Sequence, residues 1–465
     1  MLLRQAIDSL LEQVSQWQLL GKLPLKSDNN SIVCLSSPVA KVPSLEWLNA
    51  QDCYPKFFWS PAQNLSSFAG VGEAWRVSTK GQQSSRDVMD GVQQLLKDAT
   101  PEVCFMGGRR FNSEGQPGVE WSKWPDACFI LPRVVLKQNE HESRLMAFIP
   151  RFSQTDESKA LEELRACLLK LSDKSTAISS THFAYHQRRE VVKKEHWDVN
   201  IGKILDGIRA DRLQKVVLAR AVDFVFNANA QPSPLELLQG LRGLAPDAFH
   251  FCIELDKNEG FVGASPELLY HRYGKSIRSE ALAGTTSKEG KDLDENLALI
   301  KALQSNDKER REHLWVLQYL EAKLKPLCKS LQRVSLMEGL KWANAQHLRS
   351  RLEGTLKDGV EDADLLYTLH STPAVCGVPQ SKARDLIQSI EGFDRGWYAG
   401  TIGCVSRGET ILSVALRCGL LFNNLLRVYA GAGIVSGSEK SKEWNETAIK
   451  MGNWAKLLQG IVKGD

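Results

Sequence analysis

The feature of this sequence that most constrains its fold is a set of β-strand patterns joined by short turns. The strand patterns, rich in apolar, β-branched and aromatic residues, lie at 215–226, 248–255, 260–264, 267–273 and 276–284. The turns between successive strands are brief and rich in Gly and Asn. Because parallel strands need a crossover of about a dozen residues or more, such turns predict antiparallel pairing.

Helices and further strands surround this region. Up to about residue 190 the chain mixes strand patterns with helical patterns, at 57–61, 104–108, 128–136 and 144–152 and at 84–99 and 157–172 respectively. The first residues predict an amphipathic helix that docks on the body through Leu3, Ile7, Leu10, Leu11, Val14 and Trp17. After a polar connector at 176–186, helices are expected at 195–212 and from about Lys291 to Lys325, where Pro326 stops the helix. Strands return after about Gly396, before a final helix.

Composition excludes several classes of protein. Net charge is +4 and the basic residues are spread along the chain, so nothing indicates nucleic-acid binding. No apolar segment approaches the ~20 residues of a membrane span, and Arg4, Asp8 and Glu12 interrupt the first segment, which therefore does not resemble a signal peptide. None of the ten cysteines forms a C-x-x-C pair, and Cys252 and Cys418 stand in apolar strand patterns. Buried structural thiols in a reducing cytoplasm are expected.

The stretch 427–450 carries the strongest signal for chemistry. It predicts a strand ending in a Gly-Ala-Gly turn, followed by a polar loop and a helix. Gly431 and Gly433 let backbone N–H groups approach a ligand. Glu443, Glu446 and Lys450 share one face of the helix. This arrangement suits a divalent metal and a small anion, although an ordinary surface ion pair between Glu446 and Lys450 explains the spacing as well.

A hairpin turning at Asn423-Asn424 locates one cationic side chain. In that register Phe422 pairs with Leu425, and Arg417 falls opposite Ala430 with Ala415 and Ala432 on the same face. A guanidinium surrounded by small residues has open space in front of it, as an anion site requires. The alternative is an arginine that reaches out to solvent along the surface.

A second hairpin, turning near Gly274-Lys275, locates an acidic side chain. It brings Glu267 opposite Leu282, close to the turn at Gly284 and Thr285. Apolar neighbours such as Leu269 and Leu282 raise the pKa of a carboxyl group. The alternative is a carboxylate at a strand end that reaches water.

A group of motifs between 215 and 450 resembles one known family. In chain order they are KVVLARA (215–221), GASPELL (263–269), EALAGT (280–285), REH (311–313), HSTPAVCGVP (370–379), WYAG (397–400), ALRC (415–418), YAGAGIVSGS (429–438) and EWNETAIK (443–450). Together they resemble the chorismate-utilising enzymes, which include isochorismate, salicylate, anthranilate and aminodeoxychorismate synthases. In the N-terminal half, CFMGG followed by CFILPR resembles the menaquinone-type isochorismate synthases.

The resemblance implies a fold and a metal. The fold is an α+β unit of large stacked antiparallel β-sheets covered by outer helices, in which an N-terminal portion (1–190) completes the same unit as a catalytic, chorismate-binding portion (191–465). The resemblance also implies Mg²⁺, with Glu312 and Glu446 as ligands. Glu309 and Glu443, one helical turn earlier, are implied to bind metal-bound waters, which suits the tendency of Mg²⁺ to keep several waters.

The resemblance also assigns the substrate contacts and the two proton-transfer groups. The substrate is chorismate, a dicarboxylate that needs cations and directed donors in a closed site. The implied substrate-binding residues are Gly284, Thr285, His347, Tyr398, Arg417, Gly433 and Lys450. Lys215 matches the lysine that activates the incoming water, so it must be neutral part of the time, and Glu267 matches the general acid.

The reaction implied is the isomerisation of chorismate to isochorismate by a cytoplasmic enzyme, as the first step of menaquinone synthesis. A salicylate synthase and an isochorismate synthase of a siderophore pathway remain alternatives. Ammonia-using members of the family typically carry Gln at the position of Lys215, so no glutamine amidotransferase subunit is expected. A non-catalytic scaffold would have lost acid, base or metal residues, yet Lys215, Glu267, Glu312 and Glu446 are all present.

Overall fold

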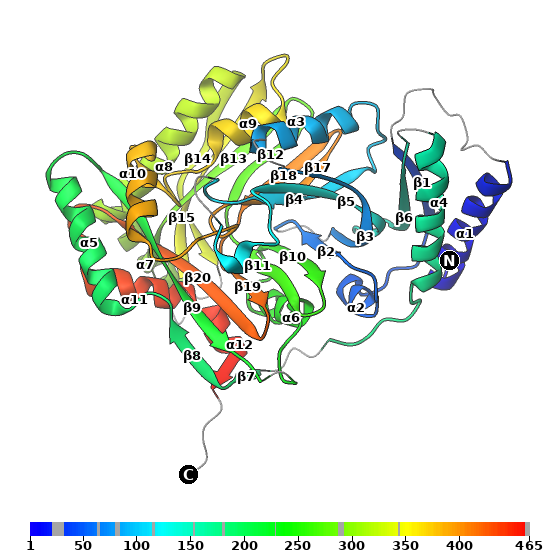
Figure 1. Ribbon diagram of the computed structural model, residues 1–465. Helices are drawn as coiled ribbons and strands as arrows, with labels where there is room; N and C mark the ends of the chain where they lie inside the picture. The colour runs from blue at the N-terminus through cyan, green and yellow to red at the C-terminus, as the bar shows by residue number, and fades with distance from the viewer. Residues whose placement is uncertain are drawn as a thin grey trace, which may run out of the picture.

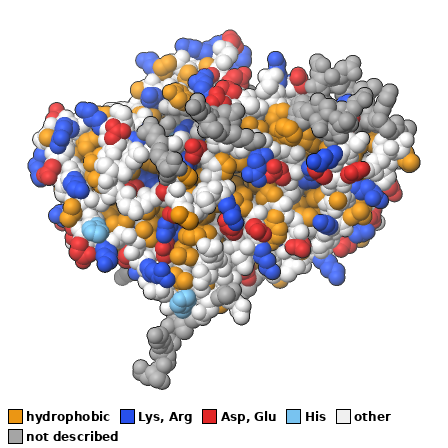
Figure 2. All heavy atoms as spheres, in the orientation of Figure 1, with side chains coloured by type: hydrophobic (Ala, Val, Ile, Leu, Met, Phe, Trp, Pro, Cys, Tyr) orange, Lys and Arg blue, Asp and Glu red, His pale blue; other side chains and the backbone are white. Residues whose placement is uncertain are grey.

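The structure of the protein is a computed structural model, shown in Figure 1. It describes residues 1–20, 32–62, 66–79, 84–113, 117–151, 154–178, 182–227, 229–286, 293–342 and 345–460. No helix in these ranges is long and apolar enough to cross a membrane. On the face seen in Figure 2, acidic and basic side chains are interspersed, without a broad area of one sign.

The N-terminal portion contains strands and helices close to the predicted ranges. Its elements are α1 (Leu3–Leu20), β1 (Ile32–Pro38), α2 (Ser44–Asn49), β2 (Lys56–Ser60), β3 (Ser67–Ser78), α3 (Ser85–Leu96), β4 (Cys104–Arg109), β5 (Ala127–Gln138), β6 (Ser143–Pro150), α4 (Gln154–Lys170), β7 (Phe183–Tyr185) and β8 (Gln187–Glu190). The amphipathic pattern of α1 is confirmed, because Leu3, Ile7, Leu10 and Val14 are buried. The expected polar connector at 176–186 contains β7.

The second portion begins with α5 and carries the long strands. Its elements are α5 (Lys194–Arg209), β9 (Lys215–Val225), α6 (Pro234–Leu244), β10 (Phe249–Asp256), β11 (Glu259–Ser265), β12 (Leu268–Tyr273), β13 (Ser276–Thr286), α7 (Leu293–Ser305), α8 (Asp307–Leu324), β14 (Cys328–Trp342), β15 (Ala345–Leu356), α9 (Asp362–Leu369), β16 (Gly377–Val378), α10 (Gln380–Ile390), β17 (Thr401–Ser406), β18 (Glu409–Val414), β19 (Cys418–Phe422), β20 (Leu425–Ile434), α11 (Lys440–Lys450), α12 (Gly452–Leu457) and β21 (Leu458–Gly460).

One predicted helix is two helices. The continuous helix expected up to Lys325 is interrupted at Asn306, whose side chain accepts hydrogen bonds from the amides of Lys308 and Glu309 and so caps the start of α8. A 3₁₀ turn at Lys325–Leu327 follows α8, as the proline at 326 requires. The predicted start near Lys291 lies outside the described residues.

The strands form one network of antiparallel pairs, as the short turns predicted. Every pairing described within this network is antiparallel, and a separate parallel pair joins β7 to β21. Strands of the N-terminal portion pair with strands of the second portion at β2–β10, β4–β17 and β8–β9. The two portions therefore share a continuous hydrogen-bonded framework.

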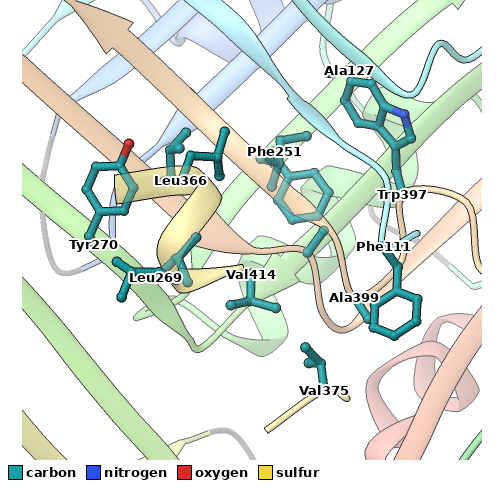
Figure 3. Packing of buried hydrophobic residues seen from close by; sticks show 14 of the residues in the cluster. Phe111, Ala127, Phe251, Leu269, Tyr270, Leu366, Val375, Trp397, Ala399 and Val414 are labelled. Atoms are coloured by element: carbon teal, nitrogen blue, oxygen red, sulfur yellow. The ribbon is translucent and has the colours of Figure 1, made fainter. Parts of the chain in front are cut away.

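Helices cover the outside of this framework, and apolar side chains fill its interior. Figure 1 shows α1 and α4 at one end, α3, α8 and α9 along the top, and α5, α10 and α11 at the other end. The larger of two buried clusters contains Phe251, Tyr270 and Trp397, which Figure 3 shows gathered between strands and the helix α9. The α+β fold of antiparallel sheets under outer helices is confirmed.

Candidate active site

A cavity opens where β9, β13, β20, α8 and α11 come together. Residues far apart in the sequence line it: Val217, Pro266, Glu267, Leu282, Ala283, Gly284, Glu309, Glu312, His347, Ala374, Val375, Tyr398, Leu416, Arg417, Tyr429, Ala430, Gly431, Glu446 and Lys450. Most of the predicted site residues are therefore brought together.

Lys215 lies just behind the cavity wall, as the first residue of β9. Its side chain is fully buried, and its Nζ donates to Oε1 of Glu312 at 2.8 Å. The backbone is fixed on both sides, because Lys215 pairs with Val378 of β16 and the next residues pair with β20. The amine therefore has one defined position beside a carboxylate that faces the cavity.

Gly433 makes room for this pair. A Cβ atom at Gly433 would lie 2.4 Å from Oε1 of Glu312 and 3.0 Å from Cε of Lys215. Gly433 pairs with Val217 in β9 and stands behind the cavity lining, to which Gly431 belongs. The expectation that the Gly433 amide holds a substrate carboxylate stays a prediction.

Glu267 is buried at the cavity, immediately before β12, and is only 3% exposed. Its backbone carbonyl accepts hydrogen bonds from Oγ of Ser413 at 2.8 Å and from the amide of Val414 at 3.0 Å. Burial raises the pKa of the Glu267 carboxyl to about 8, although the charges of Lys215 and Lys450 oppose the shift. The carboxyl is therefore mostly protonated at neutral pH.

The predicted hairpin register around Glu267 holds only near the turn. Pairing of β12 with β13 ends at His271 and Arg278, and Leu282 pairs instead with Arg349 of β15. Glu267 and Leu282 nevertheless both face the cavity. The prediction placed Glu267 and Leu282 at the same site, which is correct, although the strand pairing on which it was based ends before it reaches them.

Lysines hold the predicted metal-binding carboxylates in this structure. Besides the pair of Glu312 with Lys215, Glu446 on α11 pairs with Lys450 at 2.6 Å, and Glu443 pairs with Lys308 of α8 at 2.7 Å. Burial disfavours the ionised form of Glu312, but the adjacent Lys215 outweighs it and lowers the pKa of that carboxyl. Lys308 was not anticipated, although it stands next to Glu309 in the sequence.

These carboxylates fit a magnesium ion. Glu309, Glu312 and Glu446 line the same cavity, and oxygen donors are what Mg²⁺ prefers. Glu443 stands behind them, 1% exposed, and its Oε2 is buried with no hydrogen-bond partner in the described part of the chain. Burial raises the pKa of Glu443, and the charge of Glu446 adds to this shift while Lys308 opposes it. Within the described ranges, no group of three or more His, Cys, Asp or Glu side chains is already arranged to hold a metal ion, and lysines pair with three of these four carboxylates.

Next to the carboxylates, the cavity also carries cationic groups suited to an anion. Arg417 donates from a terminal nitrogen to the carbonyl of Lys450 at 2.6 Å, and Nζ of Lys450 donates to the carbonyl of Gly431 at 3.0 Å. Burial lowers the pKa of Arg417 to about 10, which still leaves it cationic at neutral pH. Tyr398 stacks on Tyr429 with ring centroids 5.1 Å apart.

The predicted placement of Arg417 on a strand was wrong. Pairing of β19 with β20 stops at Gly419 and Val428, and Ala430 pairs with Arg220 of β9. Arg417 itself has a φ of 50°, so its backbone leaves the strand before the pairing would reach it. The side chain still reaches the cavity, which Leu416, Ala430 and Gly431 also line.

Two further predicted contacts lie on β13 and β15. Gly284 has a φ of 80° at an irregularity in the β13–β15 pairing, which favours glycine there. His347 pairs with Thr285, lines the cavity and has its pKa lowered to about 3 by burial and by the charges of Arg417 and Lys450, so its ring is neutral. The side chain of Thr285 lies outside the described part of the structure.

A buried ion pair that sequence reasoning missed supports one wall of the cavity. Arg395 and Glu391 are each 3% exposed at the side chain and form two hydrogen bonds, at 2.7 and 2.5 Å. Arg395 also donates to the carbonyls of Val217 and Val375, both cavity residues, at 2.8 Å. Glu391 accepts from the Ala219 amide of β9 at 2.7 Å. The sequence signal that could have drawn attention to Arg395 is its position, two residues before the WYAG motif.

Comparisons with known proteins identify the family to which the chain is similar. The family model described as chorismate binding enzyme matches residues 15–459. Isochorismate synthase 2 of Arabidopsis thaliana, a chloroplastic protein, is 32% identical over 93% of this chain and 81% of its own length. The salicylate biosynthesis isochorismate synthase of Pseudomonas aeruginosa is 31% identical over 88% of this chain and 85% of its own length.

The fold also matches a solved structure over almost its whole extent. The menaquinone-specific isochorismate synthase MenF of Escherichia coli superposes with a TM-score of 0.83 and 26% sequence identity, covering 97% of this chain and 100% of that one. The match includes the N-terminal portion, which agrees with the resemblance of that half to the menaquinone-type isochorismate synthases. The family model covers far more than half of the sequence, and the chain therefore belongs to the chorismate-binding enzyme family.

Proposed function

We propose that this protein is an isochorismate synthase that isomerises chorismate to isochorismate with Mg²⁺. The observation that carries the proposal is one cavity served by both a buried lysine, Lys215, and a carboxyl that is protonated at neutral pH, Glu267. The isomerisation needs one group that accepts a proton from water and another that donates a proton to the leaving hydroxyl, each in an environment that suits its role. Isochorismate synthases among the relatives support the same reaction.

The two groups divide the chemistry. Lys215 accepts a proton from a water that attacks ring C2 of chorismate. Glu267 gives its proton to the C4 hydroxyl, which departs as water while the double bonds shift. Because Lys215 is paired with Glu312 in this structure, it must first part from that carboxylate to become a base. One water enters and one leaves, so the reaction is balanced and reversible.

The carboxylates and the cationic groups hold the substrate between these residues. We assign Glu312 and Glu446 as direct ligands of Mg²⁺, with Glu309 and Glu443 arranged around its waters. When bound, the ion draws electron density from the ring carboxylate and fixes its position. Arg417, Tyr398, Lys450 and the backbone at Gly433 hold the enolpyruvyl carboxylate. We assign Gly284, Thr285 and His347 to contacts near the ring of the substrate.

We further propose that the reaction takes place in the cytoplasm, without a glutamine amidotransferase subunit, as the first step of menaquinone synthesis. A lysine at position 215 supports water rather than ammonia as the nucleophile. Ten free thiols fit a reducing compartment. Similarity to MenF of Escherichia coli favours menaquinone synthesis, while the salicylate-pathway relative from Pseudomonas aeruginosa supports the siderophore alternative.

Product analysis tests the proposal directly. Pure protein is incubated with chorismate and Mg²⁺, and the products are separated by chromatography. Isochorismate alone is the expected product, and chelation of the metal by EDTA is expected to stop its formation. Salicylate with pyruvate would instead identify a salicylate synthase. Absence of turnover with intact chorismate binding would point to a non-catalytic scaffold.

A further inference from the structure

Two thiols from distant parts of the chain meet near the N-terminal end of the molecule. Cys53 lies in the loop between α2 and β2, and Cys167 lies in the last turn of α4. The two side chains share a hydrogen bond and act on each other's ionisation. Both are partly exposed, unlike most of the ten cysteines. In Figure 1, α2 and α4 lie toward the end of the molecule away from α11, which carries the cavity residues Glu446 and Lys450.

The backbone holds this contact from both sides. The side-chain amide of Gln51 donates to the carbonyl of Ser172 at 3.2 Å and accepts from its amide at 2.9 Å, which ties the Cys53 loop to the end of α4. On the other side, the amide of Gly72 donates to the carbonyl of Pro55 at 2.9 Å. A Cβ at Gly72 would lie 3.7 Å from Sγ of Cys167. These contacts hold the Cys53 loop, the end of α4 and the start of the segment after Val71 together, which is the setting in which the two side chains share their hydrogen bond.

Cations outnumber carboxylates around the pair. The positive charge of Lys170 favours the thiolate form of both cysteines, Lys56 favours that of Cys53 and Arg133 that of Cys167, while the carboxylate of Asp52 opposes the ionisation of Cys53. One terminal nitrogen of Arg133 pairs with Glu163 at 2.6 Å, while the other is buried without a hydrogen-bond partner among the described residues. The hydrogen bond from Cys167, with the help of the lysines, lowers the pKa of Cys53 to about 7 against the effect of burial. A thiolate is the reactive form of cysteine.

Other thiols lack this combination. Cys104 and Cys404, on the paired strands β4 and β17, also interact with each other, but they are only 8% and 6% exposed. Burial raises the pKa of Cys404 well above its ordinary value. Cys34 is partly exposed, yet burial and Glu102 raise its pKa to about 12. Partial exposure, a thiol neighbour and a cationic environment coincide at Cys53 and Cys167.

We propose that Cys53 and Cys167 are an oxidation site that forms a reversible intramolecular disulfide, with Cys53 as the attacking thiol and Cys167 as the resolving one. With oxidised glutathione as the oxidant, the Cys53 thiolate attacks one sulfur, forms a mixed disulfide and releases one glutathione thiolate. Cys167 then loses its proton to solvent, attacks the sulfur of Cys53 and releases the second glutathione. The protein loses two hydrogens, and the oxidant is reduced to two thiols.

Peptide mapping by mass spectrometry tests the proposal. The full-length protein is treated with oxidised glutathione, alkylated and digested. A cross-linked peptide pair containing Cys53 and Cys167 is the expected product, and dithiothreitol is expected to reverse it. Because the bond closes the long segment between the two residues, the oxidised protein should also unfold at a temperature several degrees higher.

Single variants separate the two roles. Cys167→Ser is expected to stop at glutathione attached to Cys53, since no resolving thiol remains, whereas Cys34→Ser should form the cross-link like the wild type. A stable mixed disulfide on Cys53 in the wild-type protein would overturn the proposal, as would a disulfide between Cys104 and Cys404 formed at an equal rate. Modification of Cys34 before Cys53 would overturn it as well.

Discussion

At the scale of single residues, the environment of Glu267 sets a pH dependence. A general acid must carry its proton, and burial raises the pKa of this carboxyl to about 8. We therefore expect kcat to hold below that pH and to fall as pH rises through about 8. Glu267→Gln should lower kcat by roughly 10²–10⁴-fold, the usual contribution of such a group. A pH–rate profile measured on both proteins checks this, and a wild-type rate that stays constant to pH 10 would contradict the assignment.

The same carboxyl should make stability fall with rising pH, in the same direction as its effect on catalysis. The ordinary pKa is 4.5, so between that value and about 8 the folded protein keeps a proton that the unfolded chain has lost. Folding stability contributed by this group is therefore complete at low pH and declines as pH rises through that window. Glu267→Gln removes the ionisation, so the variant should gain Tm relative to the wild type at pH 9 but not at pH 5. Equal Tm differences at both pH values would argue against a buried carboxyl.

Lys215 should matter for water addition more than for binding. It is fully buried behind the cavity wall, in contact with Glu312 rather than among the lining residues. Lys215→Ala is therefore expected to abolish isochorismate formation while chorismate binding, measured by calorimetry, stays within about tenfold of the wild type. Turnover at the wild-type rate in this variant would refute the role of base.

The residue scale also shows where sequence reasoning succeeds. Glu267, Glu312, Tyr398 and Glu446 were predicted from short motifs, and the fold brings all of them to one cavity. Arg395 was missed because its role depends on a carboxylate and two carbonyls that only the folded chain places around it. Residues that act through others leave a weaker pattern than residues that touch a ligand.

At the scale of elements, the pair of Arg395 with Glu391 links β9, the segment before β16 and Tyr398. Both side chains are almost fully buried, so Arg395→Met leaves Glu391 as an uncompensated buried charge, which typically costs about 3–5 kcal/mol. We expect a marked fall in Tm together with a fall in kcat, because Val217 and Val375 lose their anchor. Arg395→Lys should not rescue either property, since one ammonium cannot replace the forked guanidinium.

A matched control exists on α5. Arg209 pairs with Asp206 on the surface, where both side chains are more than half exposed. Arg209→Met should change Tm and kcat little, as exposed pairs contribute about 0–1 kcal/mol. If Arg395→Met proved as mild as Arg209→Met in unfolding and turnover assays, the supporting role of the buried pair would be excluded.

Elements with a clear apolar period were predicted well, and the others were not. β9 through β13 have apolar runs bounded by turns and lie close to the expected ranges. The long β14 was not predicted because much of it is exposed, as at Gln332 and Arg333, which removes the hydrophobic alternation. The break at Asn306 did leave a signal, an Asn-Asp pair before an acidic first turn, which is typical of a helix N-terminus.

At the scale of the whole molecule, strand pairing crosses between residues 1–190 and 191–465. β2 pairs with β10, β4 with β17 and β8 with β9. Division of the chain into an N-terminal portion and a catalytic portion stays a prediction about function. The hydrogen bonds between strands of the two portions favour a single unit that unfolds cooperatively. Calorimetry of the full chain should show a single thermal transition, and a fragment of residues 1–190 should show none. Two well-separated transitions would identify independently folding domains.

The overall class of fold followed from the sequence because turn length and strand periodicity are local properties. The order in which strands lie side by side did not follow, since β4 meets β17 across almost 300 residues of chain. Such long-range pairings depend on the collective burial of apolar faces, which no short window of sequence contains.

Gly433 has a consequence for variation at this position. The space that a methyl group would occupy there is already taken by a carboxylate oxygen and a lysine methylene. Any other amino acid would require the side chain of Glu312 or of Lys215 to shift, and the proposed reaction needs both in place. In a library that samples all amino acids at position 433, selection of cells that depend on the enzyme's product for growth should recover only glycine codons. Glycine is required there although it contributes no side chain to the site.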